Sequence, residues 1–246
     1  MAPDKVSLER ARSGIARNVA EIRQRIGEAC ARSGRSEADV TLVAVSKYYP
    51  VEFVSVALKE GVSHFGENRP QELARKAETV GKEGDAARIR WHMIGHIQRN
   101  KASVIADIAE LVHSVDSVRL AAALSGRRED SPEPLRCLVQ VNISAEASKG
   151  GFDPADVVAG IGQMSILRGI RIVGLMGMAA PVSDPGEIRG QFAGLRCLAD
   201  KVRGALIPGV EMTQLSMGMS GDFEVAIEEG ATLIRLGSAV FEQGRQ

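Results

Sequence analysis

The stretch "DVTLVAVSK" (residues 39–47) contains an apolar run that ends on a serine and a lysine. Its apolar part, residues 42–45, does not alternate with polar residues, which is typical of a strand buried on both faces. The segment that follows, residues 51–59, has the pattern of a helix and is ended by a glycine. A buried strand followed by a helix is the basic unit of an α/β fold, so this stretch predicts the first such unit.

The same unit recurs along the chain. Seven more apolar runs read as strands, at residues 63–67, 89–95, 110–116, 135–144, 170–178, 211–218 and 231–240. Helical patterns stand between them, at 70–80, from 97, from 117, and at 154–166, 186–206 and 223–229. Eight such strands in about 200 residues predict a closed (β/α)8 TIM barrel. A doubly wound open sheet is the alternative, but no GxGxxG motif follows the first strand, which weakens its dinucleotide-binding form.

An additional helix precedes the barrel. Residues 7–32 carry apolar side chains at helical spacing with arginine and glutamate between them. We therefore predict one domain over residues 1–246, a single-domain α/β barrel with an extra N-terminal helix. Neither a linker nor a low-complexity tract suggests a second domain.

The composition limits the partners of the chain. Lys plus Arg and Asp plus Glu are equal at 31 each, which gives no general reason to bind nucleic acid or a membrane surface. The three cysteines are distant from one another, which fits a reducing cytoplasm better than a disulfide framework or a zinc site. The first ten residues lack the apolar core of a signal peptide, and the longest uncharged apolar stretch, residues 172–183, is too short to span a bilayer. We expect a cytoplasmic protein, either a monomer or a weak dimer.

The carboxyl ends of the strands are where such barrels place their active sites. Strand seven ends in "SMGMSGD" (216–222) and strand eight in "RLGS" (235–238). Barrels often bind phosphate at these two loops, and Ser220 and Ser238 with nearby backbone N–H groups would form such a cradle. The alternative is ordinary local structure, in which Ser220 caps a helix and Gly237 forms a turn.

Lys47 ends the first strand and points toward the mouth of the predicted barrel. Partial burial would lower the pKa of its amine, and a neutral amine can form a Schiff base with a carbonyl. A phosphate cradle across the mouth then indicates a phosphorylated aldehyde, of which pyridoxal phosphate is the common one. Arg235 would face its pyridine nitrogen and keep that nitrogen unprotonated, because arginine does not give up its proton. A surface or ion-paired Lys47 and a structural ion pair of Arg235 are the alternatives.

These segments resemble a known family. "LVAVSK", "HFGENRPQE", "WHMIGHIQRNK", "VNIS", "GLMGM" and "LSMGMSGDFEVAIEEGATLIRLGSAVF" are similar, in order and spacing, to the pyridoxal phosphate homeostasis proteins, also called the proline-synthetase co-transcribed family. The resemblance covers about residues 8–241. It implies a barrel like the N-terminal domain of alanine racemase. It also implies a role in keeping free pyridoxal phosphate low and in supplying it, without robust catalysis; pyridoxal-phosphate-dependent enzymes would then be partners.

The resemblance also implies the roles of particular residues. Lys47 would form the Schiff base, and Arg235 would contact the pyridine nitrogen. The remaining cofactor-binding residues would be Ser220, Gly237 and Ser238 at the phosphate, Asn68 and His92 at the ring, and Met217 near it. The sequence departs from the family pattern at Tyr48-Tyr49, directly after the lysine, which could reshape the rim of the pocket.

Two enzyme functions are the alternatives. An amino-acid racemase with the same barrel would need a second proton donor on the face opposite the lysine. The only tyrosines, Tyr48 and Tyr49, adjoin the lysine in sequence, which makes that role geometrically awkward. A lysine-dependent aldolase would use the same amine without a bound cofactor. His64 and His113 lie among apolar residues, and we expect them to be core histidines with satisfied hydrogen bonds.

Overall fold

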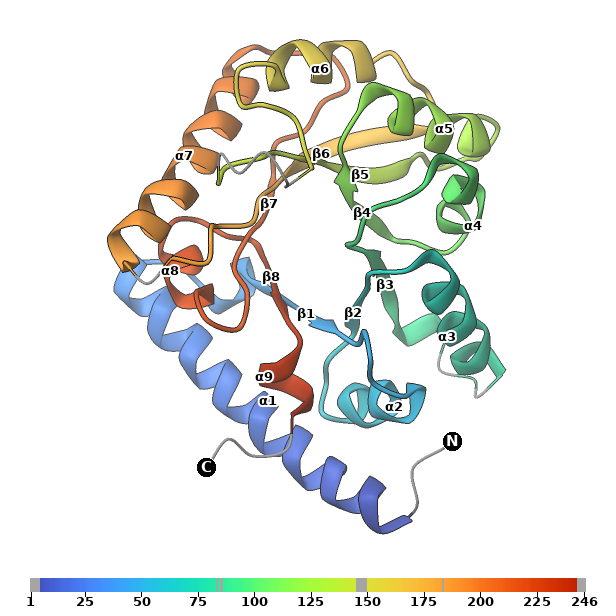
Figure 1. Ribbon diagram of the computed structural model, residues 1–246, viewed down its shortest axis with the longest axis vertical. Helices are drawn as coiled ribbons and strands as arrows, with labels where there is room; N and C mark the ends of the chain where they lie inside the picture. Colours follow the sequence, from blue (N-terminus) through green and yellow to red (C-terminus); the bar gives the residue numbers. More distant parts are fainter. Residues whose placement is uncertain (1–4, 83, 85, 145–149, 183, 243–246) are drawn as a thin grey trace.

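The computed structural model describes residues 5–82, 84, 86–144, 150–182 and 184–242, so both ends of the predicted domain lie outside the described residues. Eight parallel strands form a closed barrel in which each strand pairs with the next along the chain and the last pairs with the first (Figure 1). The prediction of a (β/α)8 barrel is therefore confirmed, and the open sheet is wrong. The strands are β1 Thr41–Val45, β2 His64–Glu67, β3 Arg90–Met93, β4 Leu111–Val115, β5 Leu135–Gln140, β6 Ile170–Met176, β7 Gln214–Ser216 and β8 Leu233–Leu236.

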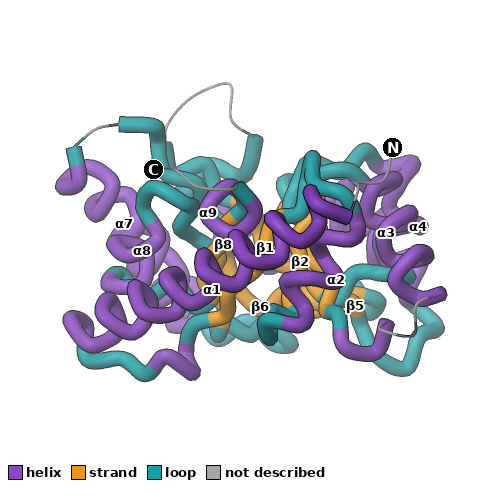
Figure 2. Tube along the Cα trace, turned by 90° about the horizontal axis from the view of Figure 1, so that it is seen from below, coloured by secondary structure: helices purple, strands orange, loops and turns teal. Residues whose placement is uncertain are grey.

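Helices enclose the barrel on its outside (Figure 2). They are α1 Lys5–Ser33, α2 Val51–Lys59, α3 Pro70–Lys82, α4 Ala102–Ala106, α5 Val118–Arg128, α6 Val157–Met164, α7 Pro185–Gly204, α8 Phe223–Glu228 and α9 Ser238–Phe241, with short 3-10 turns at Glu37–Asp39, Ala86–Arg88 and Arg99–Lys101. The extra helix α1 lies across the outside of α2, α8 and α9. It ends where Gly34 adopts a φ of 67°, a left-handed conformation that favours glycine.

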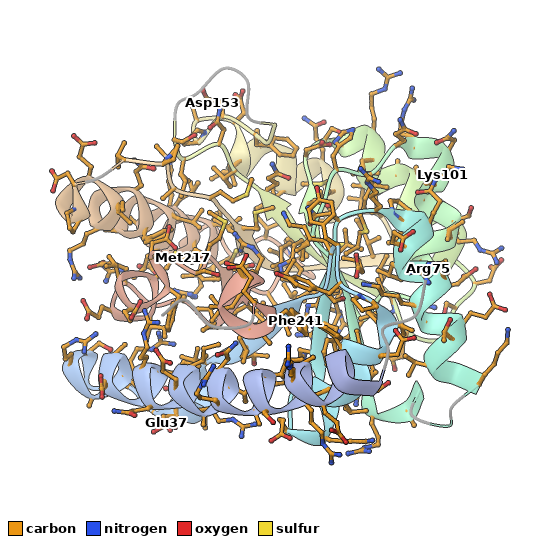
Figure 3. The ribbon with its side chains drawn as sticks, turned by 60° about the horizontal axis from the view of Figure 1, so that its bottom comes forward. Glu37, Arg75, Lys101, Asp153, Met217 and Phe241 are labelled. Atoms are coloured by element: carbon orange, nitrogen blue, oxygen red, sulfur yellow. The ribbon has the colours of Figure 1, made fainter. Side chains whose placement is uncertain are left out.

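Two helical segments differ from the sequence prediction. The helix expected from residue 97 begins later, as a 3-10 turn that leads into the short helix α4. The sequence predicted no helix behind the last strand, but α9 forms a single turn there. Phe241, labelled in Figure 3 beside α1, is buried at this turn, so contact with another helix stabilises a turn too short to be stable alone.

Alternation along the strands decides which side chains face the barrel interior. Successive side chains of a strand point to opposite faces, so Val43 and Val45 face one side while Leu42 and Ala44 face the other. Val43 packs with Leu111, Leu138, Val173, Met176 and Leu233 in a small apolar cluster separate from the main core. Residues with the same parity as Val43 on β1 therefore point into the barrel, and the next of these beyond the strand is Lys47. Among the described residues, no helix is both long and apolar enough to cross a membrane.

Candidate functional site

A pocket of about 760 Å³ opens at the carboxyl ends of the strands. Lys47 and Asn68 reach it because each continues the inward-facing parity of its strand, β1 and β2. Arg235 reaches it from the middle of β8, two residues after the inward-facing Leu233. The full lining is Val45, Lys47, Asn68, Ile94, Gly95, His96, Asp116, Gln140, Gly150, Met178, Met219, Ser220, Gly221, Arg235, Gly237 and Ser238. We call this the mouth pocket.

Lys47 forms part of the wall between the mouth pocket and a second pocket of about 580 Å³. Its side chain is partly exposed, and its amine has neither a hydrogen-bond nor an ion-pair partner within the described part of the chain. The amine lies 5.8 Å from the centre of the Tyr48 ring. Tyr48 is 87% exposed and has a φ of 69°, which is uncommon for a residue other than glycine. The alternative of a surface lysine agrees with the structure in that the amine is accessible. It differs in that the side chain lines a cavity.

A buried ion pair stabilises the backbone just before Lys47. Lys76 on α3 donates hydrogen bonds to a carboxylate oxygen of Glu67 at 2.6 Å and to the backbone oxygen of Ser46 at 2.7 Å. The Ser46 hydroxyl donates to the same carboxylate oxygen at 2.6 Å. Both charged residues are 1% exposed, and Ser46 is fully buried. The cluster therefore ties together the ends of β1 and β2, one residue before Lys47 and one residue before Asn68.

Gly95 fixes the backbone at Asn68 from the other side. A Cβ atom at position 95 would lie 2.2 Å from the backbone oxygen of Asn68 and 2.7 Å from its Cα. Real atoms do not approach so closely, so a side chain here would displace the loop that carries Asn68. This close approach requires glycine in the motif "MIGH", which follows β3.

The loops after β7 and β8 bring together a set of hydrogen-bond donors. The hydroxyl oxygens of Ser220 and Ser238 lie 3.4 Å apart, and the Ala239 N–H lies 3.5 Å from the Ser220 oxygen. Within the described residues, the backbone N–H groups of Ser220, Gly221 and Ser238 have no acceptor. Several donors that line one cavity without an acceptor among the described residues fit a phosphate group, so the chemistry of this cradle matches the group that the sequence predicts.

Contacts of Met219, Asp222 and Gly218 stabilise the loop after β7 that carries Ser220. The Met219 N–H donates to a carboxylate oxygen of Asp222 at 2.5 Å. Burial raises the pKa of Asp222, although this hydrogen bond and the charge of Arg235 act in the opposite direction. Gly218 has a φ of 93°, and a Cβ there would lie 2.7 Å from the Cβ of Ala226. Ser220 does not act as the N-cap of α8, because Asp222 occupies that position.

Arg235 is a buried cation that faces the mouth pocket. It is 5% exposed, and it donates to the hydroxyl of Ser216 at 2.6 Å and to the backbone oxygen of Gly177 at 3.2 Å. Burial lowers the pKa of its guanidinium to about 10, and the charge of Asp222 partly opposes this effect. The group therefore stays protonated at neutral pH. Within the described residues no carboxylate forms an ion pair with Arg235, so the structural ion pair expected as the alternative is not present there.

Two of the predicted site residues lie elsewhere. His92 is 2% exposed and is hydrogen-bonded to two other histidines inside the barrel, so it does not line the mouth pocket. Met217 is fully buried in the main core, since it follows the inward-facing Ser216 and points to the opposite face of β7; Figure 3 labels it. The other six predicted residues line the mouth pocket: Lys47, Asn68, Ser220, Arg235, Gly237 and Ser238.

Further side chains complete the pocket wall. Nδ1 of His96 lies 3.1 Å from a carboxylate oxygen of Asp116, and Met178 and Met219 supply apolar surface. Gln140 was not predicted, although it ends β5 at the same edge of the barrel, which is a signal that could have identified it.

Comparison with known proteins agrees with this geometry. Residues 13–243 match the family model described as alanine racemase, N-terminal domain, so the chain belongs to that class of barrel. A curated protein of Pseudomonas aeruginosa named pyridoxal phosphate homeostasis protein is 41% identical over 231 residues, which cover 93% of this chain and 95% of that one. The chain therefore belongs to the pyridoxal phosphate homeostasis protein family, as the sequence motifs predicted.

Solved structures show the same fold. An unknown protein from Bifidobacterium adolescentis superposes with a TM-score of 0.90 at 36% identity, over 98% of each chain. PipY of Synechococcus elongatus, solved with PLP bound, superposes with a TM-score of 0.79 at 33% identity, over 92% of this chain and 99% of that one.

Proposed function

We propose that this protein binds pyridoxal 5'-phosphate and takes part in the intracellular homeostasis of that cofactor, without robust catalysis. The observation that carries the proposal is the mouth pocket, where an amine, a buried guanidinium and a set of unpartnered donors line one cavity. The relative named for pyridoxal phosphate homeostasis and the PLP-bound relative support it.

Different residues of the pocket would bind different parts of the cofactor. Lys47 would hold the aldehyde carbon as a Schiff base, which consumes the amine and the carbonyl and releases water. Ser220, Ser238 and their backbone N–H groups would bind the phosphate, and Arg235 would donate a hydrogen bond to the pyridine nitrogen. Bound pyridoxal phosphate supplies an electron sink, and a guanidinium that keeps its proton at the ring nitrogen weakens that sink.

The racemase alternative finds little support in the geometry. A second proton donor would have to lie across the cofactor from Lys47. Tyr48 lies on the same side, since its ring centre is 5.8 Å from the lysine amine. Tyr49 packs against Phe53 and Phe241, with ring centres 6.2 and 4.8 Å away. The chain has no third tyrosine.

The test is cofactor retention by matched lysine variants. Purified protein is incubated with pyridoxal phosphate, passed through a desalting column and scanned for absorbance in the visible range. We expect a Schiff-base band in the wild type, its loss in Lys47→Ala, and its full retention in Lys59→Ala, an exposed lysine at the end of α2. An unchanged band in Lys47→Ala would contradict the assignment of the lysine. A wild type that does not absorb or retain cofactor would contradict the proposed function.

The proposal includes a reducing, cytoplasmic setting and exchange of cofactor with pyridoxal-phosphate-dependent enzymes. The three cysteines, of which Cys30 and Cys137 are buried, form no disulfide in the structure. Disulfides are rare where the thiol pool is kept reduced. Fractionation of cells that express the protein with a C-terminal tag tests the location. Transfer of bound cofactor to an apo-enzyme that depends on it tests the exchange.

A further inference from the structure

A chain of polar side chains crosses the interior of the barrel and ends at Arg235. Nδ1 of His64 lies 2.9 Å from Nε2 of His92, and Nδ1 of His92 lies 2.8 Å from Nε2 of His113. Nδ1 of His113 lies 2.8 Å from the hydroxyl oxygen of Ser216, which accepts a hydrogen bond from Arg235 at 2.6 Å. The chain therefore joins β2, β3, β4, β7 and β8 through four consecutive hydrogen bonds.

Arginine decides the direction of every bond in this chain. A guanidinium only donates, so the Ser216 oxygen must accept from Arg235. Ser216 is fully buried, and its hydroxyl hydrogen has one acceptor among the described residues, Nδ1 of His113. His113 must then carry its proton on Nε2 and donate to His92. For the same reason His92 carries its proton on Nε2, from which it donates to His64.

The opposite direction leaves a buried group unsatisfied. If Nδ1 of His113 donated to Ser216, the serine hydroxyl hydrogen would have no acceptor among the described residues. An unsatisfied buried donor disfavours that arrangement by roughly 5- to 150-fold. The other end of the chain, His64, does not offset this cost. His64 is only partly buried, so its Nε2 can bond to water whichever way the chain is directed.

The three rings are neutral at physiological pH. Burial lowers the pKa of His92 to about 3 and lowers the pKa of His113 well below its usual value. Burial also lowers the pKa of His64, although the nearby Glu110 raises it. Neutral rings are required for a one-way chain, since an imidazolium donates from both nitrogens and could not accept from its neighbour.

We propose that His64, His92, His113 and Ser216 form a one-way hydrogen-bonded chain that orients the Arg235 guanidinium in the mouth pocket. The four are positioning residues, since none of them lines the pocket. With the Ser216 oxygen and the Gly177 oxygen accepting from two different nitrogens, the plane of the guanidinium is fixed. The meaning of this orientation for the cofactor rests on the proposed function, but the direction of the chain does not.

The direction is tested in the protein without cofactor. Two-bond ¹H–¹⁵N correlation spectra of the imidazole rings at pH 7.5 report which nitrogen carries the proton. We expect the Nε2–H form to make up at least about four-fifths of His92 and of His113, from the lower limit of the preference above. A dominant Nδ1–H form at either residue would overturn the one-way chain, whether or not the protein binds pyridoxal phosphate.

The positioning role is tested with two variants at one position. His113→Leu removes the acceptor of the Ser216 hydroxyl, whereas His113→Asn keeps an oxygen where Nδ1 now lies. We expect the dissociation constant for pyridoxal phosphate to rise on the order of 10-fold in His113→Leu and to stay within about 3-fold of the wild type in His113→Asn. Equal affinity of wild type and His113→Leu would overturn the positioning role. Equal losses in the two variants would overturn it as well, because loss of packing alone would then explain them.

The ring spectra and the affinity measurements test the hydrogen-bonded chain and the proposed function separately. If the wild type binds no pyridoxal phosphate, the proposed function fails while the ring spectra still decide the direction of the chain. If His113→Leu does not fold, the separate Nη signals of Arg235 in the wild-type spectrum still report on its orientation. Distinct signals are expected for a guanidinium fixed at two nitrogens, and one averaged signal would contradict it.

Discussion

Replacing Lys76 by methionine removes one partner of the buried ion pair behind Lys47. The amine and the Glu67 carboxylate are 2.6 Å apart, and an effective dielectric constant of about 20 gives an attraction on the order of 6 kcal/mol. Relaxation and water entry recover part of this loss, and breaking a buried pair typically costs about 3–5 kcal/mol. For a chain of this length that corresponds to a fall in melting temperature of about 6–20 °C.

The same helix supplies a matched control. Lys82 pairs with Glu78 at 2.8 Å, but both side chains are mostly exposed, at 73% and 69%. Solvent screens an exposed pair of this kind, so its contribution to stability is small and Lys82→Met should leave the protein nearly unchanged. Urea unfolding of both variants, followed by circular dichroism, makes the comparison.

A double variant separates the charge from the packing. Glu67→Gln combined with Lys76→Met removes both charges and keeps an acceptor for the Ser46 hydroxyl. It should recover at least half of the stability lost in Lys76→Met alone, because no uncompensated carboxylate remains buried. If Lys76→Met costs no more stability than Lys82→Met, the buried ion pair does not stabilise the ends of β1 and β2.

Further predictions concern the loops, the phosphate cradle and the interior. Gly95→Ala would place a Cβ 2.2 Å from a backbone oxygen of the β2–α3 loop, so it should cost about 1–3 kcal/mol in urea unfolding. Gly81→Ala, a helical position with open space, should not destabilise, and equal effects would contradict the close approach. Alanine at both Ser220 and Ser238 removes two donors to a dianion and should weaken pyridoxal phosphate binding on the order of 10²-fold or more in a fluorescence titration; unchanged binding would place the cradle elsewhere. His92 has a folded-state pKa of about 3 against about 6.5 when unfolded. Between about pH 3 and pH 6.5 the unfolded chain therefore binds more protons at this residue than the folded chain does. As the pH falls below 6.5, His92 should lower the free energy of unfolding by up to about 1.4 kcal/mol per pH unit. A free energy of unfolding that stays constant between pH 7 and 4.5 would contradict the burial of His92 as a neutral ring.

The barrel could be predicted because its strands carry a strong signal. Apolar runs such as 42–45 and 172–176 are largely buried on both faces, and the glycines and prolines between the elements mark their ends. The shorter helices were harder to predict from the sequence. The helix α4 has only five residues, and α9 is stabilised by its contact with α1, which the local sequence does not reveal.

Residues of the mouth pocket could be predicted where the alternation of side chains along a strand is enough to decide which of them point inward. Lys47 and Arg235 share the inward face of neighbouring strands, so both were expected at the mouth. His92 also points inward, but the stagger of the strands determines its depth, and the sequence does not give that stagger. Met217 points outward, which parity with Ser216 could have shown.

The buried Lys76 was not predicted, although the sequence holds a sign of it. Leu73, Lys76 and Val80 recur at helical spacing on the face of α3 that packs against the barrel. A lysine on an apolar stripe requires a buried partner. Its partner Glu67 lies nine residues earlier on a strand, a contact that only the fold brings about.

The central claim is that Lys47 holds pyridoxal phosphate in the mouth pocket. Borohydride reduction of the protein loaded with pyridoxal phosphate, followed by digestion and mass mapping of the peptides, tests it most directly, because reduction makes the link to the lysine permanent. We expect a pyridoxyl group on Lys47 and on no other lysine. Label on a different lysine, or no labelled peptide from a protein that retains its fold, would contradict it.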